Sequence, residues 1–219
     1  MGQAADPGDP YEATNRQIFE ANLQLDRMAF ARTARAYNKY VPEFARDRIH
    51  DLLQNLDLPV TFANDLLQGE GKRAGETFAR FTVNSTIGLG GLFDPATEHF
   101  KMPDHSEDFG QTLGVWGMGG DPYLMLPVLG PSSPRDLAGR IVDAGLDPMT
   151  WLRFKQHIWW QGGRFYMEML DLRARNIDNL ADIERSTVDL YASTRSLYRQ
   201  YREHEILNGR VPKENLPDL

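Results

Sequence analysis

The feature that most constrains this chain is a long, nearly uncharged segment in its middle. Residues 109–134 read FGQTLGVWGMGGDPYLMLPVLGPSSP, and Asp121 is the one charged side chain among these 26 residues, although 25% of the whole chain is charged. Twelve of the 19 glycines lie between Gly69 and Gly130. Loops that face water are usually polar, and buried irregular backbone must satisfy its own hydrogen bonds. The segment therefore predicts contact with lipid or a partner, with a buried loop rich in Gly and Pro as the alternative.

Neither this segment nor the uncharged stretch 81–93 has the pattern of a membrane-spanning helix. Spanning takes about 20 consecutive apolar residues, whereas Gly, Pro or polar residues interrupt both stretches within a few positions. The first residues, MGQAADP, lack the basic region and apolar core of a secretory leader. This start indicates a cytosolic protein or a chain whose leader has been removed.

The overall composition excludes several classes of function. The 219 residues include no cysteine, which removes thiolate nucleophiles, cysteine zinc sites and iron–sulfur clusters. The net charge of −7 argues against nucleic acid as the main partner, because phosphate binding needs clustered cations. A chain of this length buries roughly 70% of its unfolded surface. It is therefore long enough for one large domain or two small ones.

Hydrophobic spacing at helical period dominates both flanks of the central segment, and no alternating strand pattern exceeds four residues. We predict an all-α protein of roughly eight helices in one domain. The expected helices are a first one from Pro10 to about Tyr40, a second from Pro42, a third from Pro59 to Gly69, a fourth from Lys72 to Thr86, one from Pro134 to about Gly145, one from Pro148 that Gly162 and Gly163 break, and a last segment from Asp182 to Leu207.

Signatures of catalysis are missing from the sequence. It contains no G-x-S-x-G, no H-E-x-x-H, no Walker loop and no complete G-x-G-x-x-G. His99 and His105 flank Asp104, but a metal site needs three or four convergent ligands, so solvated loop histidines are the better interpretation. A lipid hydrolase using Ser85 or Ser106 is the weakest alternative, because no triad pattern surrounds either serine. The residues themselves indicate neither catalysis nor a metal site.

Three other patterns bear on binding. Arg32, Arg35 and Lys39 share one helix face, which indicates either a solvated face or a patch that faces phosphate groups. Arg164 follows two glycines and is flanked by aromatic residues of the kind that prefer a membrane interface. Gly110 and Gly114 have the spacing that permits close helix approach.

Nine short blocks in one order carry a resemblance to a known family. They are DPYEATNR (9–16), LLQG (66–69), RF (80–81), NSTIGLGG (84–91), FGQTLG (109–114), DPY (121–123), LP (126–127), GP (130–131) and RD (135–136). Together they resemble the MlaA (VacJ) family of Gram-negative bacteria, over roughly residues 9–209. On this resemblance we expect a tether at 1–8, the MlaA-like helical domain at 9–209 and a tail at 210–219.

The resemblance implies an outer-membrane lipoprotein on the periplasmic side that removes mislocalised phospholipid from the outer leaflet. It implies an all-α, ring-shaped, monotopic domain of short amphipathic helices in the inner leaflet, around a central amphiphilic lipid channel. Lipid would pass to the periplasmic shuttle MlaC, and trimeric porins would be partners. The resemblance implies neither enzyme activity nor a cofactor. The family is anchored by an N-terminal lipidated cysteine, which we expect to have been cut off with the leader.

Within this framework we expect two groups of site residues. Neutral hydrogen-bonding groups and one cation would contact the lipid headgroup along its path: Asn84, Ser85, Thr86, Gln111, Thr112 and Arg164. The segment from residue 109 to 120 corresponds to a hairpin loop that gates the channel in the family, and its members are Phe109, Gly110, Gly114, Trp116, Gly117, Gly119 and Gly120.

One alternative comes from a different class of function. The near-heptad spacing from Asp182 to Leu207 also fits a soluble helical interaction or scaffold protein with a coiled-coil surface. Such a protein would be a monodisperse oligomer without detergent, and it would not bind liposomes. The lipid channel instead predicts a protein that needs detergent for solubility and copurifies with phospholipid.

Overall fold

The computed structural model describes residues 8–152 and 157–210. Within these ranges the chain forms helices and one small antiparallel hairpin. In chain order the elements are α1 (Glu12–Leu25), the π-helical turn η1 (Asp26–Phe30), α2 (Ala31–Tyr40), α3 (Glu43–Leu67), α4 (Gly71–Thr86), α5 (Pro95–Glu98), α6 (Phe109–Val115), β1 (Leu124–Leu126), β2 (Gly130–Ser132), α7 (Pro134–Leu146), α8 (Pro148–Trp151), α9 (His157–Arg175), α10 (Ile177–Ser186) and α11 (Leu190–Ile206).

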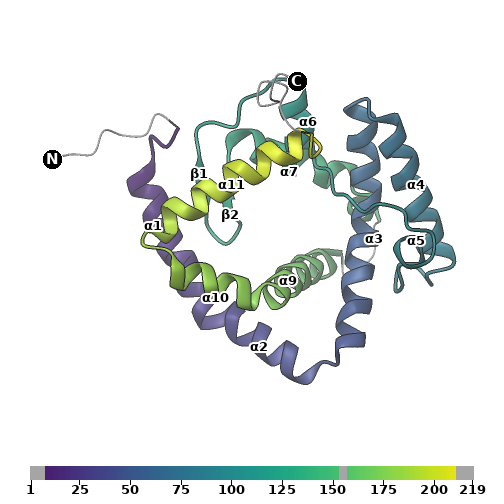
Figure 1. The fold of residues 1–219 in the computed structure, drawn as a ribbon, viewed down its shortest axis with the longest axis horizontal. Coiled ribbons are helices and arrows are strands. Elements are labelled where there is room, and N and C mark those ends of the chain that lie inside the picture. The colour runs from purple at the N-terminus through teal and green to yellow at the C-terminus, as the bar shows by residue number, and fades with distance from the viewer. Residues whose placement is uncertain (1–7, 153–156, 211–219) are drawn as a thin grey trace, which may run out of the picture.

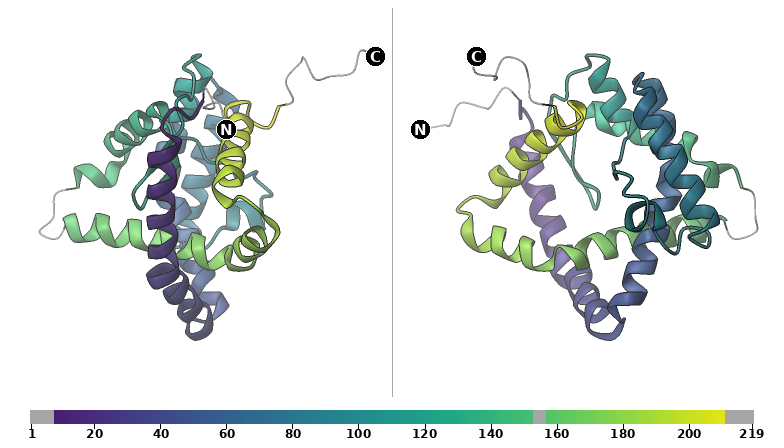
Figure 2. Two further views of the ribbon diagram at one scale, coloured as in Figure 1. Left: turned by 90° about the vertical axis from the view of Figure 1, so that its left-hand side faces the viewer. Right: turned by 45° about the vertical axis from the view of Figure 1, so that its right-hand side comes forward.

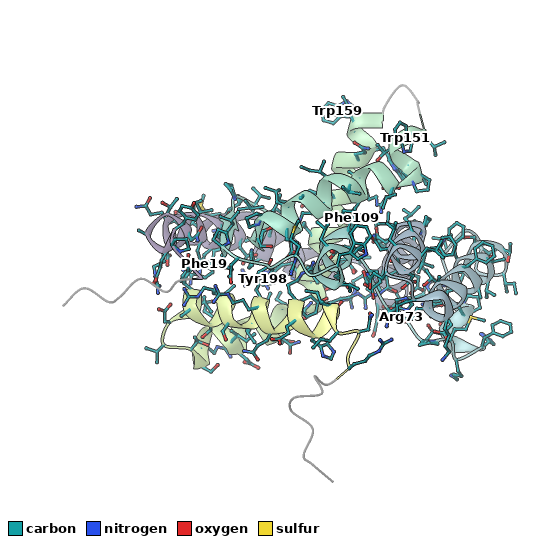
Figure 3. The ribbon with its side chains drawn as sticks, turned by 90° about the horizontal axis from the view of Figure 1, so that it is seen from above. Phe19, Arg73, Phe109, Trp151, Trp159 and Tyr198 are labelled. Carbon is teal, nitrogen blue, oxygen red and sulfur yellow. The ribbon has the colours of Figure 1, made fainter. Side chains whose placement is uncertain are left out.

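The helices are arranged as a ring around an open centre (Figure 1). α1, η1 and α2 form one side and α3 the opposite side, with α4 and α5 outside α3, while α11, α6 and α7 close the ring. The same opening is visible obliquely in Figure 2. Seen from above, α8 and the start of α9 project from one side of the ring, with Trp151 and Trp159 at their ends (Figure 3). The arrangement confirms the predicted all-α, ring-shaped domain.

Polar caps determine where several helices begin. Asp108, Ser133 and Asp189 each accept a hydrogen bond from the backbone amide three residues later, at 2.8, 3.1 and 3.0 Å. These bonds satisfy amide groups that the first helical turn leaves free. The helix predicted to start at Pro134 starts there, and the one expected over residues 72–86 is α4.

Three predicted helix boundaries are wrong. α3 continues through Pro59, because packing along α4 outweighs the single backbone hydrogen bond that proline removes. α9 continues through Gly162 and Gly163, whose propensity cost is about 1 kcal/mol each. The last segment is not one helix, because Asp189 caps a new one and separates α10 from α11.

The buried interior of the described residues is more polar than apolar. Seventeen buried residues are polar or charged and eleven are hydrophobic. Seven of the apolar ones form two small clusters, one between α2 and α9 around Tyr37 and Leu170, the other between β1 and α11 around Tyr123 and Tyr191. Many large apolar side chains are exposed instead, among them Met28, Tyr40, Phe44, Phe78, Ile87, Ile141, Trp151, Ile158 and Trp159. Hydrogen bonds and ion pairs therefore hold much of the ring, and the large apolar side chains on its outside remain exposed, as they do at interaction surfaces.

α6 and α7 approach each other at two glycines. A Cβ on Gly139 would lie 2.7 Å from the Cα of Gly110 and closer still to its nitrogen. A Cβ on Gly114 would lie 2.6 Å from Ile206 of α11. The spacing of Gly110 and Gly114, which on its own was only a weak signal, thus serves close helix packing here. The same spacing at residues 71 and 75 serves none, since nothing lies within 4 Å of either position.

Candidate functional site

A cavity of about 640 Å³ lies on the inner side of the ring, between α1, α10 and α11. Phe19 and Tyr198 mark its α1 and α11 walls in Figure 3. Its other apolar or aromatic lining residues are Leu23, Pro131, Leu180, Ile183, Leu190, Leu197 and Tyr201. Its charged lining residues are Asp26, Asp108, Asp136, Arg140, Arg173, Glu184 and Arg202. An apolar wall with a few charged groups suits an amphipathic ligand.

Arg202 of α11 binds two carboxylates at one wall of this cavity. Its guanidinium nitrogens lie 2.7 Å from Asp108 and 2.9 Å from Asp136, and the Tyr198 hydroxyl donates to Asp136. Burial disfavours the charged form of Asp136, but hydrogen bonds from Arg135 and Tyr198 and the charge of Arg202 outweigh it and lower its pKa. The pKa of Asp108 is lowered too, because Arg202 and its helix-capping bond outweigh burial. These pairs join α11 to α6 and α7 and so close the ring.

A second ion pair lies where η1 meets α9. Arg173 Nε is 2.8 Å from Asp26 Oδ1, and Arg173 Nη2 is 3.0 Å from Asp26 Oδ2. Asp26 is the first residue of the π-helical turn, whose second residue, Arg27, pairs with Glu184 of α10. Single π-helical turns inside longer helices are frequent at functional sites. Here the turn presents two charged side chains to α9 and α10.

Two asparagines of α1 hold the β-hairpin that points into the ring (Figure 1). Asn15 donates to the carbonyl of Tyr123 at 3.1 Å and accepts from the amide of Met125 at 3.0 Å. Seven residues later, Asn22 repeats this pattern with Leu126 and Val128. Each side-chain amide thus pairs with the hairpin as a neighbouring strand would. The hairpin is fastened to the ring wall along β1.

Replacing Asn22 with alanine should loosen the hairpin near its turn. The variant loses two hydrogen bonds, each worth about 0.5–1.5 kcal/mol, so amide hydrogen exchange over residues 126–129 should accelerate by about 10- to 100-fold. Hydrogen-exchange mass spectrometry measures this rate. Gln24→Ala, at an exposed position of the same helix, is the control. Unchanged exchange in Asn22→Ala would show that these bonds do not hold the hairpin.

Comparison with known proteins places this architecture in a family. The family model described as MlaA lipoprotein matches residues 7–205. The chain belongs to the MlaA lipoprotein family. It is 33% identical to the intermembrane phospholipid transport system lipoprotein MlaA of Haemophilus influenzae, over 99% of this chain and 87% of that protein. The Escherichia coli protein of the same name is 31% identical, over 94% and 82% of the two chains.

A solved structure shows the same MlaA fold. It is described as the structural basis for maintenance of bacterial outer membrane lipid asymmetry, and it matches with a TM-score of 0.81 and 32% sequence identity. The match covers 90% of this chain and 98% of the other. The family is one of lipid-transport lipoproteins and not a known enzyme family. None of the helices in the described ranges is both long enough and apolar enough to span a bilayer.

The residues predicted for the lipid path do not come together in this member of the MlaA family, and none of the six lines the central cavity. Asn84 is buried and binds Asp94 and the amide of Ala96. Gln111 and Thr112 are also buried, and the Thr112 hydroxyl donates to Asn64 at 2.8 Å. The Asn84 amide and the Thr112 hydroxyl are thus occupied inside the protein, whereas Gln111 Oε1 is buried without a hydrogen-bond partner among the described residues.

The two remaining hydroxyl residues lie at the end of α4, away from the central cavity. Ser85 accepts a hydrogen bond from Asn55, and Thr86 donates back to the carbonyl of Thr82. In the part of the chain that is described, no histidine is hydrogen-bonded to Ser85 or Ser106. His105 instead contacts Asp65 and Thr77.

Arg164 contradicts the expectation of a cation available for phosphate. It lies 2.5 Å from Asp57, 2.7 Å from Asp147 and 2.7 Å from Glu168. Only 11% of its side chain is exposed. Three carboxylates around one guanidinium make the surroundings negative and would repel a phosphate. Arg164 therefore ties α9 to α3 and to the start of α8.

The first half of the predicted gating loop is a helix and not a loop. Phe109, Gly110 and Gly114 belong to α6, because Asp108 caps a helix at this point and α7 packs against it. Trp116, Gly117, Gly119 and Gly120 follow as a turn and an irregular segment. The hairpin that enters the ring is formed by β1 and β2, residues 124–132. A gating role for residues 116–120 stays a prediction.

The helix face that suggested the scaffold alternative borders the central cavity in this fold, although Leu197 and Tyr201 are still 50% and 59% exposed. Leu190, Leu197 and Tyr201 of α11, which suggested a coiled-coil seam, line the central cavity. Sequence reasoning also missed Arg173, Arg202 and the asparagine pair of α1. Only the seven-residue spacing of the two asparagines on one helix face could have drawn attention to them.

Proposed function

We propose that the protein carries phospholipid through the central cavity of its ring and thereby maintains the lipid asymmetry of the Gram-negative outer membrane. The observation that carries this proposal is a cavity inside a helical ring whose lining combines apolar side chains with charged groups. Relatives with at least 30% identity are named for intermembrane phospholipid transport. Acyl chains would lie against Leu23, Leu190 and Leu197, and headgroups would meet the charged walls.

The exposed apolar side chains support a position in one leaflet of the membrane. Met28, Phe44 and Ile141 are each at least 66% exposed, which costs little free energy in lipid and much in water. We propose that the ring is monotopic and lies in the inner leaflet of the outer membrane, facing the periplasm. A lipidated cysteine preceding residue 1 would add to this attachment, consistent with relatives that are named lipoproteins.

Removal of lipid from the outer leaflet needs an acceptor on the other side. We propose that mislocalised phospholipid enters the ring from the outer leaflet and is handed to the periplasmic shuttle MlaC, with trimeric porins as partners of the exposed apolar rim. The support is the family membership and the apolar surface described above.

Filling the cavity tests the proposal. In Leu23→Trp the larger side chain fills cavity space beside α1. The amount of phospholipid that copurifies with the detergent-solubilised protein should therefore fall by about tenfold or more, as expected when one well-packed ligand site is lost. Mass spectrometry quantifies this lipid. In cells, phosphatidylethanolamine labelled by an impermeant amine reagent should rise to the level of a strain lacking the protein.

The matched control is Leu66→Trp, at an exposed position of α3 that does not line the cavity. It should behave like the wild type in both measurements. Absence of phospholipid from gently purified wild-type protein, or normal clearance by a folded Leu23→Trp variant, would overturn the proposed route.

A further inference from the structure

The ion pair between Arg173 and Asp26 lies where four cavities meet. We propose that Arg173, together with Arg35, forms a binding subsite for the phosphate of a phospholipid, and that this phosphate takes the place of Asp26 on the Arg173 guanidinium. The inference rests on the proposed function and adds to it the residues that hold the headgroup.

Arg173 has hydrogen-bonding capacity that the protein does not use. Its Nε and Nη2 bind the two oxygens of Asp26, but its Nη1 is buried and has no hydrogen-bond partner among the described residues. A buried guanidinium N–H without an acceptor costs free energy. Another acidic ligand that reaches Nη1 removes this cost, and the planar guanidinium suits a phosphate with its several oxygens.

Arg173 borders four cavities of the structure. It lines the central cavity, a cavity of about 770 Å³ between α9 and α10, and one of about 170 Å³ beside the hairpin turn. These cavities offer apolar walls for acyl chains, including Leu23, Leu172, Leu25 and Phe30. A fourth cavity, of about 620 Å³, lies between α2 and α10 and is polar. A headgroup at Arg173 could therefore have its chains in apolar surroundings.

The polar cavity between α2 and α10 is positively charged, although the whole chain carries −7. Five cations and three carboxylates line it, a balance of +2: Arg27, Arg35, Lys39, Arg173 and Arg185 against Asp26, Asp178 and Glu184. Within the described part of the chain, Arg35 makes no ion pair. Of the basic face noted in the sequence, Arg35 and Lys39 line this cavity, whereas Arg32 does not. An anion is therefore favoured here.

Asp26 is well placed to be exchanged. Its side chain is 27% exposed, it sits at the start of the π-helical turn, and it lines three of the four cavities. In the absence of lipid it neutralises Arg173. A phosphate that arrives from the polar cavity brings the same charge and reaches Nη1 as well, so the exchange keeps Arg173 paired.

Binding of a soluble short-chain phosphatidylglycerol, below its micelle-forming concentration, tests the subsite by calorimetry. Arg173→Gln should weaken binding by about tenfold or more, because a charge-assisted pair is lost, and Arg35→Gln should weaken it in the same direction. Arg32→Gln, on the same helix as Arg35, should bind like the wild type. A diacylglycerol with the same chains should bind all four proteins equally, because it has no phosphate.

The variant Asp26→Asn separates a binding role from a structural one. If Asp26 competes with the phosphate, its removal should tighten phosphatidylglycerol binding. If the ion pair only holds α9 to η1, the same change should leave binding unchanged or weaken it, which would overturn the proposal. Inorganic phosphate should bind far more weakly than the lipid, whereas equal affinities would show a free-phosphate site and also overturn it.

The outcomes also separate this subsite from transport itself. Equal lipid affinity of the wild type, Arg173→Gln and Arg35→Gln would refute the subsite, while loss of clearance in Leu23→Trp would still support passage through the cavity. Absence of any lipid binding by the wild type would refute both. Circular dichroism checks that each variant is folded. If Arg173→Gln does not fold, Arg35→Gln still tests the subsite.

Discussion

Replacing Gly139 with alanine is expected to destabilise the protein by about 1–3 kcal/mol, because the added methyl group meets backbone. Its Cβ would lie 2.7 Å from the Cα of Gly110, well inside ordinary contact distance. Neither atom can rotate away, so α6 must shift from α7 and disturb the ion pairs of Asp108 and Asp136 at the contact. Urea unfolding followed by helical circular dichroism measures the loss.

The same helix supplies a matched control. Gly145 lies near the end of α7, and nothing is within 4 Å of the position that its Cβ would take. Gly145→Ala should therefore stabilise the protein by about 0.5–1 kcal/mol through helix propensity. Equal unfolding midpoints for the two variants would mean that the close approach of α6 and α7 does not exist.

Exchange of Arg202 for methionine is expected to cost about 3–5 kcal/mol, the largest effect on stability that we predict. Methionine keeps much of the side-chain volume but leaves Asp108 and Asp136 without their shared cation. Asp136 is 8% exposed as a side chain, so water replaces the lost partner poorly. Urea unfolding again gives the magnitude. Arg185→Met, with 80% side-chain exposure and a 3.6 Å pair, should change stability by less than about 0.5 kcal/mol.

The pH dependence of stability gives an independent check on this cluster. The folded-state pKa values of Asp108 and Asp136 lie below the usual value near 3.9. Their contribution is therefore complete above that pH and is lost as the pH falls through the lowered values. In Arg202→Met both pKa values rise, so the acid loss should begin at higher pH. Identical acid unfolding profiles for wild type and variant would contradict the assignment.

Much of the helical architecture follows from local signals. Ser133 and Pro134 determine where α7 begins, and the turn at Gly69 determines where α3 ends. Such helix caps and left-handed glycines act within a few residues, so the sequence alone reveals them. The boundaries that were wrong at Pro59 and Gly162 are positions where helix propensity is poor but packing or ion pairs are strong. Tertiary contacts override propensities of about 1–3 kcal/mol.

The candidate site was much less predictable than the helices. Asn84, Gln111 and Thr112 look like polar groups available to a headgroup, yet each is buried, and Asn84 and Thr112 bond partners at least ten residues away. Arg164 looks like a free cation, but Asp57, more than 100 positions away, is among its partners. The chain alone does not tell which polar groups are occupied, because their partners are distant.

Other residues were overlooked because nothing in the sequence marks them as functional. Arg173 and Arg202 lie in charged helical stretches and have no local feature that separates them from solvated arginines. Their roles arise because the ring brings α9 against η1 and α11 against α6 and α7. The apolar residues of α11 were likewise recognised as one helix face, but that face lines a cavity and not a coiled coil.

The amino-acid sequence by itself determined that this chain is helical, that it carries an uncharged glycine-rich centre and that it belongs with the MlaA lipoproteins, because periodicity, caps and ordered motifs are local properties. Tertiary structure alone decided that residues 109–115 form a packed helix, that two asparagines hold a hairpin inside the ring, and which charges face the cavity. Each of these depends on hydrogen bonds or close packing between residues that are far apart in the chain, and such partners exist only once the ring has closed.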